Sequence, residues 1–395
     1  MINIALVLII IGLLLFISKF FTRKRNNNYP KERLKPLNNF AILIPARDES
    51  NVIEDLLISI ENQTLQTNSK NIYVIVERID DPTVAICKKH KVNVLFRENL
   101  ELKRKGYALK EAIESITKKK NYDTYFIFDA DNVLDKNFFK EMETTYKQGY
   151  DMGIGYRNIK NKNNSISVSS GLIFTIVNTL LNKNKSKYSL NCNASGTGFY
   201  ISGDIVNKLK TWPFTSLCED YELSLYCTVN NITTCYNDKA IYYDEQPTTY
   251  KDYFNQRTRW VKGYFEARKK YIKDLYSKLR ITNNNFSSVY ESVIGIYDIL
   301  LILIGILLII INILLTNTSL FTILLYILFL MLIIYILLTL FTIYLLKIET
   351  KFNVRKKLKI KTIFIHPLML FTYLLCLIKV IIVRDISWDK IKHGK

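Results

Sequence analysis

Long uninterrupted runs of apolar residues constrain this chain more strongly than any other feature of its sequence. Four such runs lie, in order, at residues 2–21, 293–315, 320–346 and 363–383. A helix that crosses a lipid bilayer needs about 20 consecutive apolar residues, and the first three runs are long enough. The sequence therefore predicts an integral membrane protein with a transmembrane helix at 1–22 and a transmembrane hairpin at 291–346.

Basic residues beside these runs predict how the chain is oriented. The triplet Arg23-Lys24-Arg25 follows the first run directly, and the linker at 23–38 carries further lysine and arginine residues. Positive charge next to a membrane span favours the cytosolic side. We therefore expect the N-terminus to lie outside the cell and the body of the protein in the cytosol. A cleaved secretion signal is the alternative, but the first run lacks a basic segment before it and a small-residue cleavage site after it.

The last apolar run creates a conflict in topology. If 363–383 crossed the membrane, the tail that begins at Arg384 would lie outside despite its lysine residues. Pro367 interrupts the run early, and a proline inside a helix removes a backbone donor. We therefore expect residues 347–395 to comprise a basic loop, an interfacial or re-entrant apolar segment, and a cytosolic tail.

The formal net charge of +20 allows two kinds of partner, nucleic acid or an anionic membrane surface. Many of the basic residues lie within 347–361, next to the apolar runs, and this placement favours lipid headgroups. The chain contains no nucleic-acid-binding motif that we recognise. The expected partners therefore include the membrane and exclude nucleic acid. The cysteines show no metal-ligand spacing, and we expect reduced cytosolic thiols.

Residues 39–263 show the alternation that is typical of α/β domains with parallel strands. Short apolar runs predict buried strands at 40–45, 72–76, 92–96 and 125–128. Amphipathic stretches predict helices at 51–62, 83–90 and 106–116. The apolar stretch 171–181 is too short to span, so we expect a core helix there or a segment docked on the membrane interface. Residues 264–290 are basic and polar, and they predict amphipathic helices on the cytosolic membrane surface.

Asp129 and Asp131 follow the predicted strand at 125–128, separated by one small residue. Ligands bind beyond the carboxyl ends of strands in open α/β sheets. Side chains two residues apart at a strand end share one face, so both carboxylates can converge on a hard divalent cation. Such a cation would neutralise the diphosphate of a nucleotide-activated substrate. A solvated acidic turn is the alternative for an isolated pair of this kind.

Other side chains in the same region are suited to binding such a substrate. Glu77 and Asp81 follow the second predicted strand, where carboxylates next to a helix start suit a base and a ribose. Lys105, at the start of the predicted helix 106–116, can hold a diphosphate through its charge. Gly198 allows the backbone to approach a sugar closely. Helix capping and a solvated basic turn are the alternatives for the charged residues.

The second half of the domain carries groups that suit the transfer itself. Glu219 and Asp220 precede a helical stretch, and one of these carboxylates is a candidate base for an acceptor hydroxyl, with helix capping as the alternative. Gln256, Arg259 and Trp260 are spaced to share one face of a helix. An arginine binds phosphate in a forked geometry, and a tryptophan can stack on a sugar. A basic interfacial helix is the alternative.

The order and spacing of these clusters resemble membrane-bound family 2 glycosyltransferases, which include processive polysaccharide synthases and glycolipid glycosyltransferases. The resemblance covers roughly residues 39–275, with a weaker similarity toward the C-terminus. Its most specific elements are, in order, Asp129-Ala130-Asp131, Glu219-Asp220 and Gln256-x-x-Arg259-Trp260.

The resemblance implies a GT-A-type nucleotide-sugar-binding domain, with a Rossmann-like mixed sheet, between N- and C-terminal transmembrane helices. It implies a nucleotide-diphosphate-sugar donor, usually with uridine, and inversion at the anomeric carbon. Asp131 would bind Mg²⁺ or Mn²⁺, Asp129 would contact the nucleotide or serve as a second ligand, and Asp220, beside Glu219, would be the general base. The resemblance also implies that the diphosphate and the acceptor sugar are held by Gln256, Arg259 and Trp260, with Lys105 near the nucleotide. Glu77 stands where the family usually has an aspartate.

Two other functions compete with sugar transfer. A transporter or channel needs polar residues inside its spans, and only Asp298 and Asn312 qualify, both near ends. An inactive lipid-binding scaffold would be expected to lack the carboxylates, and all of them are present. Within the enzyme hypothesis, the acceptor stays open between a growing polysaccharide and a glycolipid. A secreted polymer needs a channel, for which so few spans would call for a homo-oligomer or a partner subunit.

Overall fold

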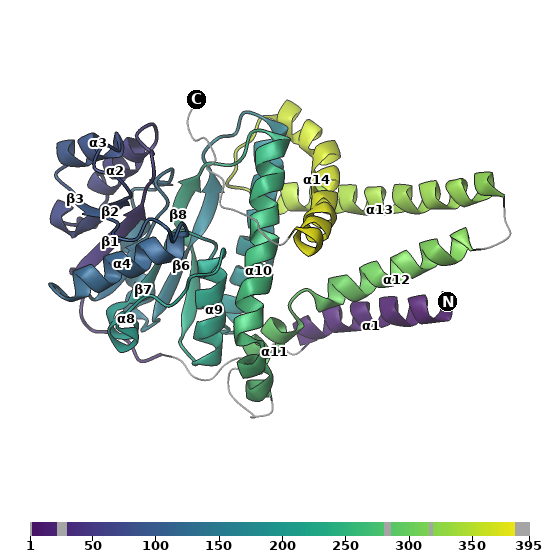
Figure 1. Cartoon of the computed structure of the whole chain (residues 1–395), viewed down its shortest axis with the longest axis horizontal. Helices are drawn as coiled ribbons and strands as arrows, with labels where there is room; N and C mark the ends of the chain where they lie inside the picture. Colours follow the sequence, from purple (N-terminus) through teal and green to yellow (C-terminus); the bar gives the residue numbers. More distant parts are fainter. Residues whose placement is uncertain (1, 22–29, 280–285, 316–318, 384–395) are drawn as a thin grey trace.

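The α/β domain predicted at residues 39–263 is built on a single mixed sheet (Figure 1). The computed structural model describes residues 2–21, 30–279, 286–315 and 319–383. Within these residues the strand order is β3-β2-β1-β4-β7-β6-β8-β5, in one eight-stranded sheet. The mixed α/β fold expected from the resemblance is confirmed.

The first four strands form the parallel part of the sheet. They are β1 (Phe40–Pro45), β2 (Ile72–Val76), β3 (Asn93–Phe96) and β4 (Thr124–Ile127). β1 pairs in parallel with β2 and β4, and β2 pairs in parallel with β3. All four were expected from their apolar runs, because a strand buried on both faces needs a continuous apolar sequence.

The rest of the sheet brings in antiparallel pairs. It consists of β5 (Val133–Leu134), β6 (Met152–Ile159), β7 (Phe199–Ser202) and β8 (Thr234–Asp244). β7 is antiparallel to both β4 and β6, whereas β6 and β8 are parallel and β5 is antiparallel to β8. These pairs place the ends of β4 and β8 at the same edge of the sheet.

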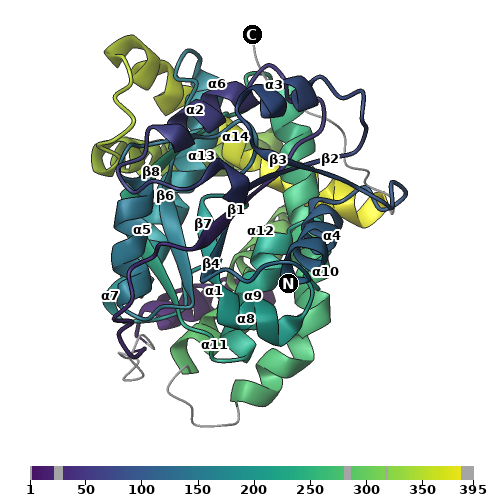
Figure 2. The same ribbon diagram turned by 90° about the vertical axis from the view of Figure 1, so that its left-hand side faces the viewer.

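Helices cover both faces of the sheet (Figure 2). Buried residues of α2 (Ile53–Glu61), α3 (Thr83–Lys89) and α5 (Phe138–Lys147) pack in one apolar core cluster. Buried residues of α4 (Lys105–Thr117), α8 (Gly203–Leu209) and α9 (Glu219–Val229) pack in a second cluster. A short 3₁₀ turn, η1, spans Ser69–Asn71. The sheet separates the two clusters, so its central strands β1 and β4 are buried on both sides.

The apolar stretch at 171–181 belongs to a longer helix than its sequence suggested. Three helical segments follow one another without a break: α6 (Ser165–Thr175), the π-helical segment η2 (Ile176–Asn182) and α7 (Lys183–Lys187). The combined helix of 23 residues is long enough to cross a membrane by length and composition, so the expectation that it is too short was wrong. It packs against β6 and α14 instead, and 56% of its apolar window is buried.

The expected boundary near residue 263 falls inside one continuous helix. α10 (Tyr250–Leu279) has 30 residues and packs against α9, α14 and α11 (Phe286–Ile294). Of the predicted interfacial segment, residues 264–279 therefore form the second half of α10, and residues 286–290 lie in α11. The reason is that buried residues recur along the whole of α10, with Tyr253 near its start and Leu275 near its end.

Three apolar helices extend away from the domain in the same direction (Figure 1). α1 (Ile2–Phe21) lies along α12 (Tyr297–Leu314), and α13 (Leu320–Ile348) extends beside them with few contacts to α12. The helices Phe286–Leu314 and Phe321–Ile348 are long and apolar enough to cross a membrane, and Ile2–Ser18 is a shorter apolar helix. The triplet Arg23-Lys24-Arg25 lies outside the described residues.

The last helix has a different direction. α14 (Lys356–Ile382) runs through Pro367 without a break, so the expected interruption is wrong, and its length and composition would allow a membrane crossing. Figures 1 and 2 show that α14 nevertheless lies across the direction of α1, α12 and α13, packed against α10, α6 and α13. The tail at 384–395 lies outside the described residues.

Candidate active site

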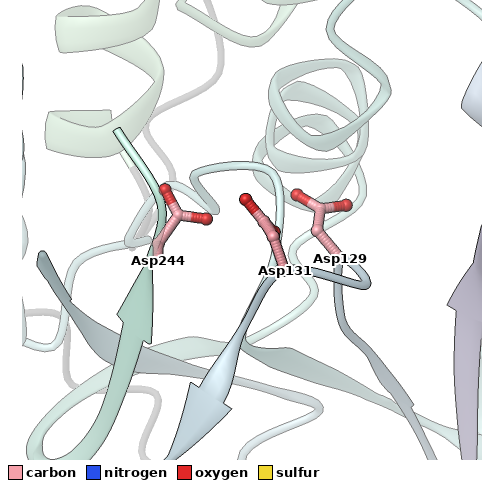
Figure 3. Close-up of side chains that lie close together, drawn as sticks. All are labelled: Asp129, Asp131 and Asp244. Carbon is pink, nitrogen blue, oxygen red and sulfur yellow. The ribbon is translucent and has the colours of Figure 1, made fainter. Parts of the chain in front are cut away.

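Three carboxylates lie together at one edge of the sheet. Asp129 follows β4, Asp131 precedes β5, and Asp244 ends β8. Each offers a carboxylate oxygen within 4.8 Å of those of the other two. Figure 3 shows the three side chains in a row, with Asp131 between the others. Hard divalent cations are bound by oxygen ligands of this kind.

Asp244 is held in place by several donors. Its Oδ2 atom accepts hydrogen bonds from Arg157 Nε at 3.0 Å, from Arg157 Nη2 at 2.5 Å and from Gln246 Nε2 at 2.5 Å. Its Oδ1 atom accepts from Asn132 Nδ2 at 2.9 Å. Arg157 Nη1 also donates to the carbonyl of Ser195 at 2.5 Å. Arg157, a residue of β6, therefore stabilises the Asp244 carboxylate with its positive charge.

The three carboxylates crowd negative charge around Asp131, which lies between the other two. Burial raises the pKa of Asp131 well above its usual range, and the charges of Asp244 and Asp129 raise it further. Like charges held close together disfavour ionisation unless a cation compensates them. The acidic donor set, its spacing and its crowding therefore fit a divalent metal ion.

Lys105 connects this cluster to the second acidic pair. Its Nζ atom lies 2.5 Å from Asp129 Oδ1 and 3.5 Å from Glu219 Oε1, and it donates to the carbonyl of Gly196 at 2.7 Å. Burial opposes the charged form, but the attraction of Asp129 and Glu219 outweighs it, so the pKa of Lys105 is raised. Lys105 is therefore a cation between two groups of carboxylates.

Glu219 and Asp220 open helix α9 beside Lys105. Burial raises the pKa of Glu219 to about 7, against the opposing charge of Lys105. Burial also raises the pKa of Asp220, while the backbone N–H of Tyr221 and the charge of Lys105 oppose the shift. A carboxylate with a raised pKa is a stronger base, and it stays ionised near neutral pH when the shift is modest.

The side chains of the α10 motif face the same space. Gln256, Arg259 and Trp260 all line the cavity described below. The Gln256 Oε1 atom is buried without a hydrogen-bond partner, and burial lowers the pKa of Arg259. Trp260 packs edge-on against Phe174, with ring centroids 5.7 Å apart. One wall of the site therefore offers an amide, a cation and an indole.

At the opposite end, charged groups surround Glu77. Arg47 Nε lies 3.1 Å from Glu77 Oε2, and Arg97 Nη1 lies 3.6 Å from Glu77 Oε1. All three residues line the cavity. Asp81 does not. Its carboxylate accepts backbone N–H donors from Asp48 and Thr83, each at 2.8 Å, and it therefore stabilises the loop after β1 rather than facing a ligand.

Gly198 also plays a different part from the one expected. It has a φ of +66°, and a Cβ atom there would lie 2.1 Å from the Tyr242 ring. The missing side chain makes room for Tyr242, whose hydroxyl donates to the Thr197 carbonyl at 3.0 Å. Gly198 does not line the cavity, whereas Gly196 does. The glycine thus serves packing, because no L side chain fits at that position.

A single cavity of about 480 Å³ joins these groups. Its polar lining includes, among others, Arg47, Glu77, Arg97, Lys105, Asp129, Asp131, Arg157, Glu219, Asp220, Asp244, Gln256, Arg259 and Trp260. Apolar side chains of the α6–η2 helix, such as Ile173 and Val177, complete one wall. The structure therefore brings residues from 47 to 260 into one site.

Sequence reasoning missed two residues at the centre of this site. The sequence predicted no function for Asp244 or for Arg157. Asp244 ends one strand and Arg157 lies within another buried strand far away in sequence. No short sequence motif therefore contains both residues. A charged residue inside an otherwise apolar strand was the one available clue for Arg157, since buried charges are normally paired.

Comparisons with known proteins identify the family. Residues 36–263 match the model of the family described as "Glycosyltransferase like family 2". Among curated proteins, the chain is 24% identical over 250 residues to the probable glycosyltransferase YdaM of Bacillus subtilis (strain 168). The match covers 61% of this chain and 59% of YdaM, so it spans less than two thirds of that relative.

Among solved structures, the fold is similar to that of the mannosyltransferase PcManGT from Pyrobaculum calidifontis in complex with GDP-Man and Mn²⁺. The TM-score is 0.55 at 12% identity, and the match covers 97% of this chain and 99% of the other. The S. aureus protein TarS 1–349 is also similar, with a TM-score of 0.44 at 15% identity over 65% of this chain and 71% of that one.

Proposed function

Because this chain belongs to the glycosyltransferase family 2, we propose that it transfers a sugar, with inversion, from a nucleotide-diphosphate-sugar to a hydroxyl of a membrane-associated acceptor. The observation that carries the proposal is the convergence of a carboxylate cluster, a second carboxylate pair and cations that include Lys105 and Arg259 in one cavity. UDP is the expected nucleotide, in keeping with the family resemblance. Family membership sets aside the transporter and channel alternative.

The three aspartates are the proposed metal site. Asp131, Asp129 and Asp244 would hold Mg²⁺ or Mn²⁺, and the Mn²⁺ in the similar Pyrobaculum mannosyltransferase supports this choice. When bound, the ion would supply positive charge next to the leaving diphosphate. Lys105 and Arg259 lie in the same cavity, and their fixed positive charges stabilise the same developing negative charge.

Asp220 is the proposed general base. It would accept the proton of the acceptor hydroxyl as the oxygen forms a bond to the anomeric carbon and the carbon–diphosphate bond breaks. One displacement of this kind inverts the configuration at that carbon. Glu219 lies against Lys105 and helps to hold that cation between the two acidic groups. Trp260 and Gln256 would orient the acceptor.

The membrane helices determine where the acceptor comes from. α10 carries Trp260 and packs against α14, and α13 and α12 extend from the same side of the domain (Figure 1). The acceptor therefore reaches the cavity from the membrane side, which suits a glycolipid or a polysaccharide made at the cytosolic face. The chain's own described spans are few, so a polymer product would call for a homo-oligomer or a partner subunit.

The proposal is tested with the purified full-length protein in lipid nanodiscs. We expect release of nucleoside diphosphate from one of a panel of labelled donors, lost on chelation and restored by Mn²⁺. Asp220→Asn is expected to lower kcat by about 10²- to 10⁴-fold, because it removes the base without removing donor contacts. Asp238→Asn, a surface carboxylate paired with Lys183, is the matched control and retains activity.

Separating lipid-soluble from high-mass product identifies the acceptor class in the same experiment. No release from any donor would support the inactive scaffold instead. Full activity in Asp220→Asn would show that another group is the base.

A further inference from the structure

A continuous path of buried hydrogen bonds joins helix α10 to the acidic cluster. Arg257 Nη2 donates to Ser170 Oγ at 2.5 Å, and Ser170 Oγ donates to Gln246 Oε1 at 2.7 Å. Gln246 Nε2 then donates to Asp244 Oδ2 at 2.5 Å. All four side chains are at most 3% exposed. The path runs from α10, through α6, to the end of β8.

The donors in this path all point the same way. An arginine can only donate and a carboxylate can only accept, so the two ends fix the orientation of the groups between them. The Asp244 carboxylate requires the NH₂ group of Gln246 to face it, so Gln246 Oε1 faces Ser170 and accepts a hydrogen bond from its hydroxyl. Reversing the amide would place Gln246 Oε1 against a carboxylate oxygen of Asp244. Water cannot easily replace these hydrogen bonds, because the groups are buried.

The near end of the path acts on the orientation of Asp244. Gln246 and Arg157 occupy its Oδ2 atom, and Asn132 donates to its Oδ1 atom. The same Asn132 Nδ2 group lies 3.2 Å from Asp131 Oδ1. Both oxygens of Asp244 therefore accept hydrogen bonds, and the Asn132 amide that holds Oδ1 also contacts Asp131 in the same carboxylate cluster.

The far end of the path lies among the acceptor-side residues. The Arg257 guanidinium lies 3.8 Å from the centre of the Trp260 ring and 4.7 Å from that of Tyr253. Its Nε and Nη1 atoms are buried and have no hydrogen-bond partner among the residues that the structure describes. Within the described part of the chain, no carboxylate forms an ion pair with it. An unpaired buried cation is costly, so its presence points to a role beyond packing.

We propose that Arg257, Ser170 and Gln246 are positioning residues, which orient Asp244 for metal binding and make metal affinity depend on the packing of α10. This inference rests on the proposed function, because it requires a metal at the three aspartates. Outer-shell partners of metal ligands commonly have such effects. A movement of α10 during acceptor binding at Trp260 would then change the orientation of Asp244 through the hydrogen bonds from Arg257, Ser170 and Gln246.

The test measures Mn²⁺ binding directly, by the electron paramagnetic resonance signal of free Mn²⁺, with full-length protein and no donor. Gln246→Met and Ser170→Ala are each expected to weaken Mn²⁺ binding by about tenfold or more, as is typical when an outer-shell partner is lost. Ser169→Ala is the matched control, because Ser169 is the neighbouring residue, is equally buried, and has a hydroxyl without a partner. It is expected to bind Mn²⁺ as the natural protein does.

Asp131→Asn separates the two proposals. If the natural protein binds no Mn²⁺, or if the Asp131→Asn variant binds Mn²⁺ as well as the natural protein does, the proposed metal site is refuted. The proposed path from Arg257 to Asp244 is then refuted with it. If Asp131→Asn abolishes Mn²⁺ binding while Ser170→Ala and Ser169→Ala bind Mn²⁺ equally well, only the proposed path from Arg257 to Asp244 is refuted. Thermal unfolding of each variant checks folding, and if Ser170→Ala does not fold, Gln246→Met alone decides the outcome.

Discussion

The proposed base, Asp220, experiences two opposing influences on its carboxyl group. Burial disfavours the negative charge and raises the pKa, whereas the Tyr221 N–H and the nearby Lys105 cation stabilise the charge. Lys105 is itself held by Asp129 and Glu219. The ionisation of the base is therefore tied to a lysine that also faces the proposed metal site. Single substitutions here change proton affinity as well as binding.

This arrangement predicts the pH dependence of the reaction. A base must be ionised, so kcat/KM at saturating Mn²⁺ is expected to fall as the pH decreases through the raised pKa of Asp220. Lys105→Met removes a cation that lowers this pKa, so the acid limb of the profile should move to higher pH, beside a loss of rate. Lys118→Met, at an exposed position beyond α4, serves as the control. An acid limb that stays in place or moves to lower pH would contradict the prediction.

At the level of elements, the site depends on how closely α10 approaches the start of α9. Gly263 lies at the contact, and a Cβ atom there would be 2.6 Å from the backbone nitrogen of Cys218. Cys218 immediately precedes Glu219 and the proposed base Asp220. Trp260 lies one turn before Gly263 on α10. The glycine therefore sets the spacing between the acceptor-side residues and the base.

Gly263→Ala is expected to separate the two helices and to lower kcat/KM by about 10- to 100-fold, because small misplacements at an active site have large effects on rate. Mn²⁺ binding should weaken as well, because the proposed path from Arg257 to Asp244 begins on the same helix. Lys269→Ala, exposed on the same helix, is the control and should retain activity. Steady-state kinetics and Mn²⁺ titration together check the prediction. Normal kinetics for Gly263→Ala would show that the contact is not needed.

At the scale of the whole molecule, the glycosyltransferase domain packs against apolar helices that run in two directions. α1, α12 and α13 extend away from the domain, and α14 lies across them (Figures 1 and 2). If the first three cross the membrane, α14 lies along its surface, with buried contacts to α10 such as the bond from Tyr253 to the Met369 carbonyl. This arrangement supports the interfacial placement proposed for the last apolar segment.

Labelling of introduced cysteines in cells tests this topology. Ser319→Cys, between α12 and α13, is expected to react with a membrane-impermeant maleimide in intact cells. Asn353→Cys, before α14, and Val383→Cys, after it, should react only after permeabilisation. Labelling at 383 in intact cells would show that α14 crosses the membrane. Labelling at 353 would show that the whole orientation is reversed. The unmodified chain gives the background of the native cysteines.

Some features of the fold and site could be predicted because their signals are local. The four parallel strands are continuous apolar runs, and Asp129 and Asp131 follow one of them directly. Gln256, Arg259 and Trp260 share a helical face by spacing alone. Other features had no local signal. Asp81 and Gly198 match the pattern of substrate-binding residues, yet one is used by backbone donors and the other makes room for a tyrosine.

The sequence by itself determined the chemical groups, the strands and helices that carry them, and the apolar segments, because these depend on residue type and short-range periodicity. Only the tertiary structure decided that Asp244 completes the acidic cluster, that Arg157 lies beneath it, and that Arg257 reaches it through Ser170 and Gln246. These contacts join residues tens of positions apart. They follow from how β6, β8, α6 and α10 pack, and packing on this scale leaves no pattern in a local stretch of sequence.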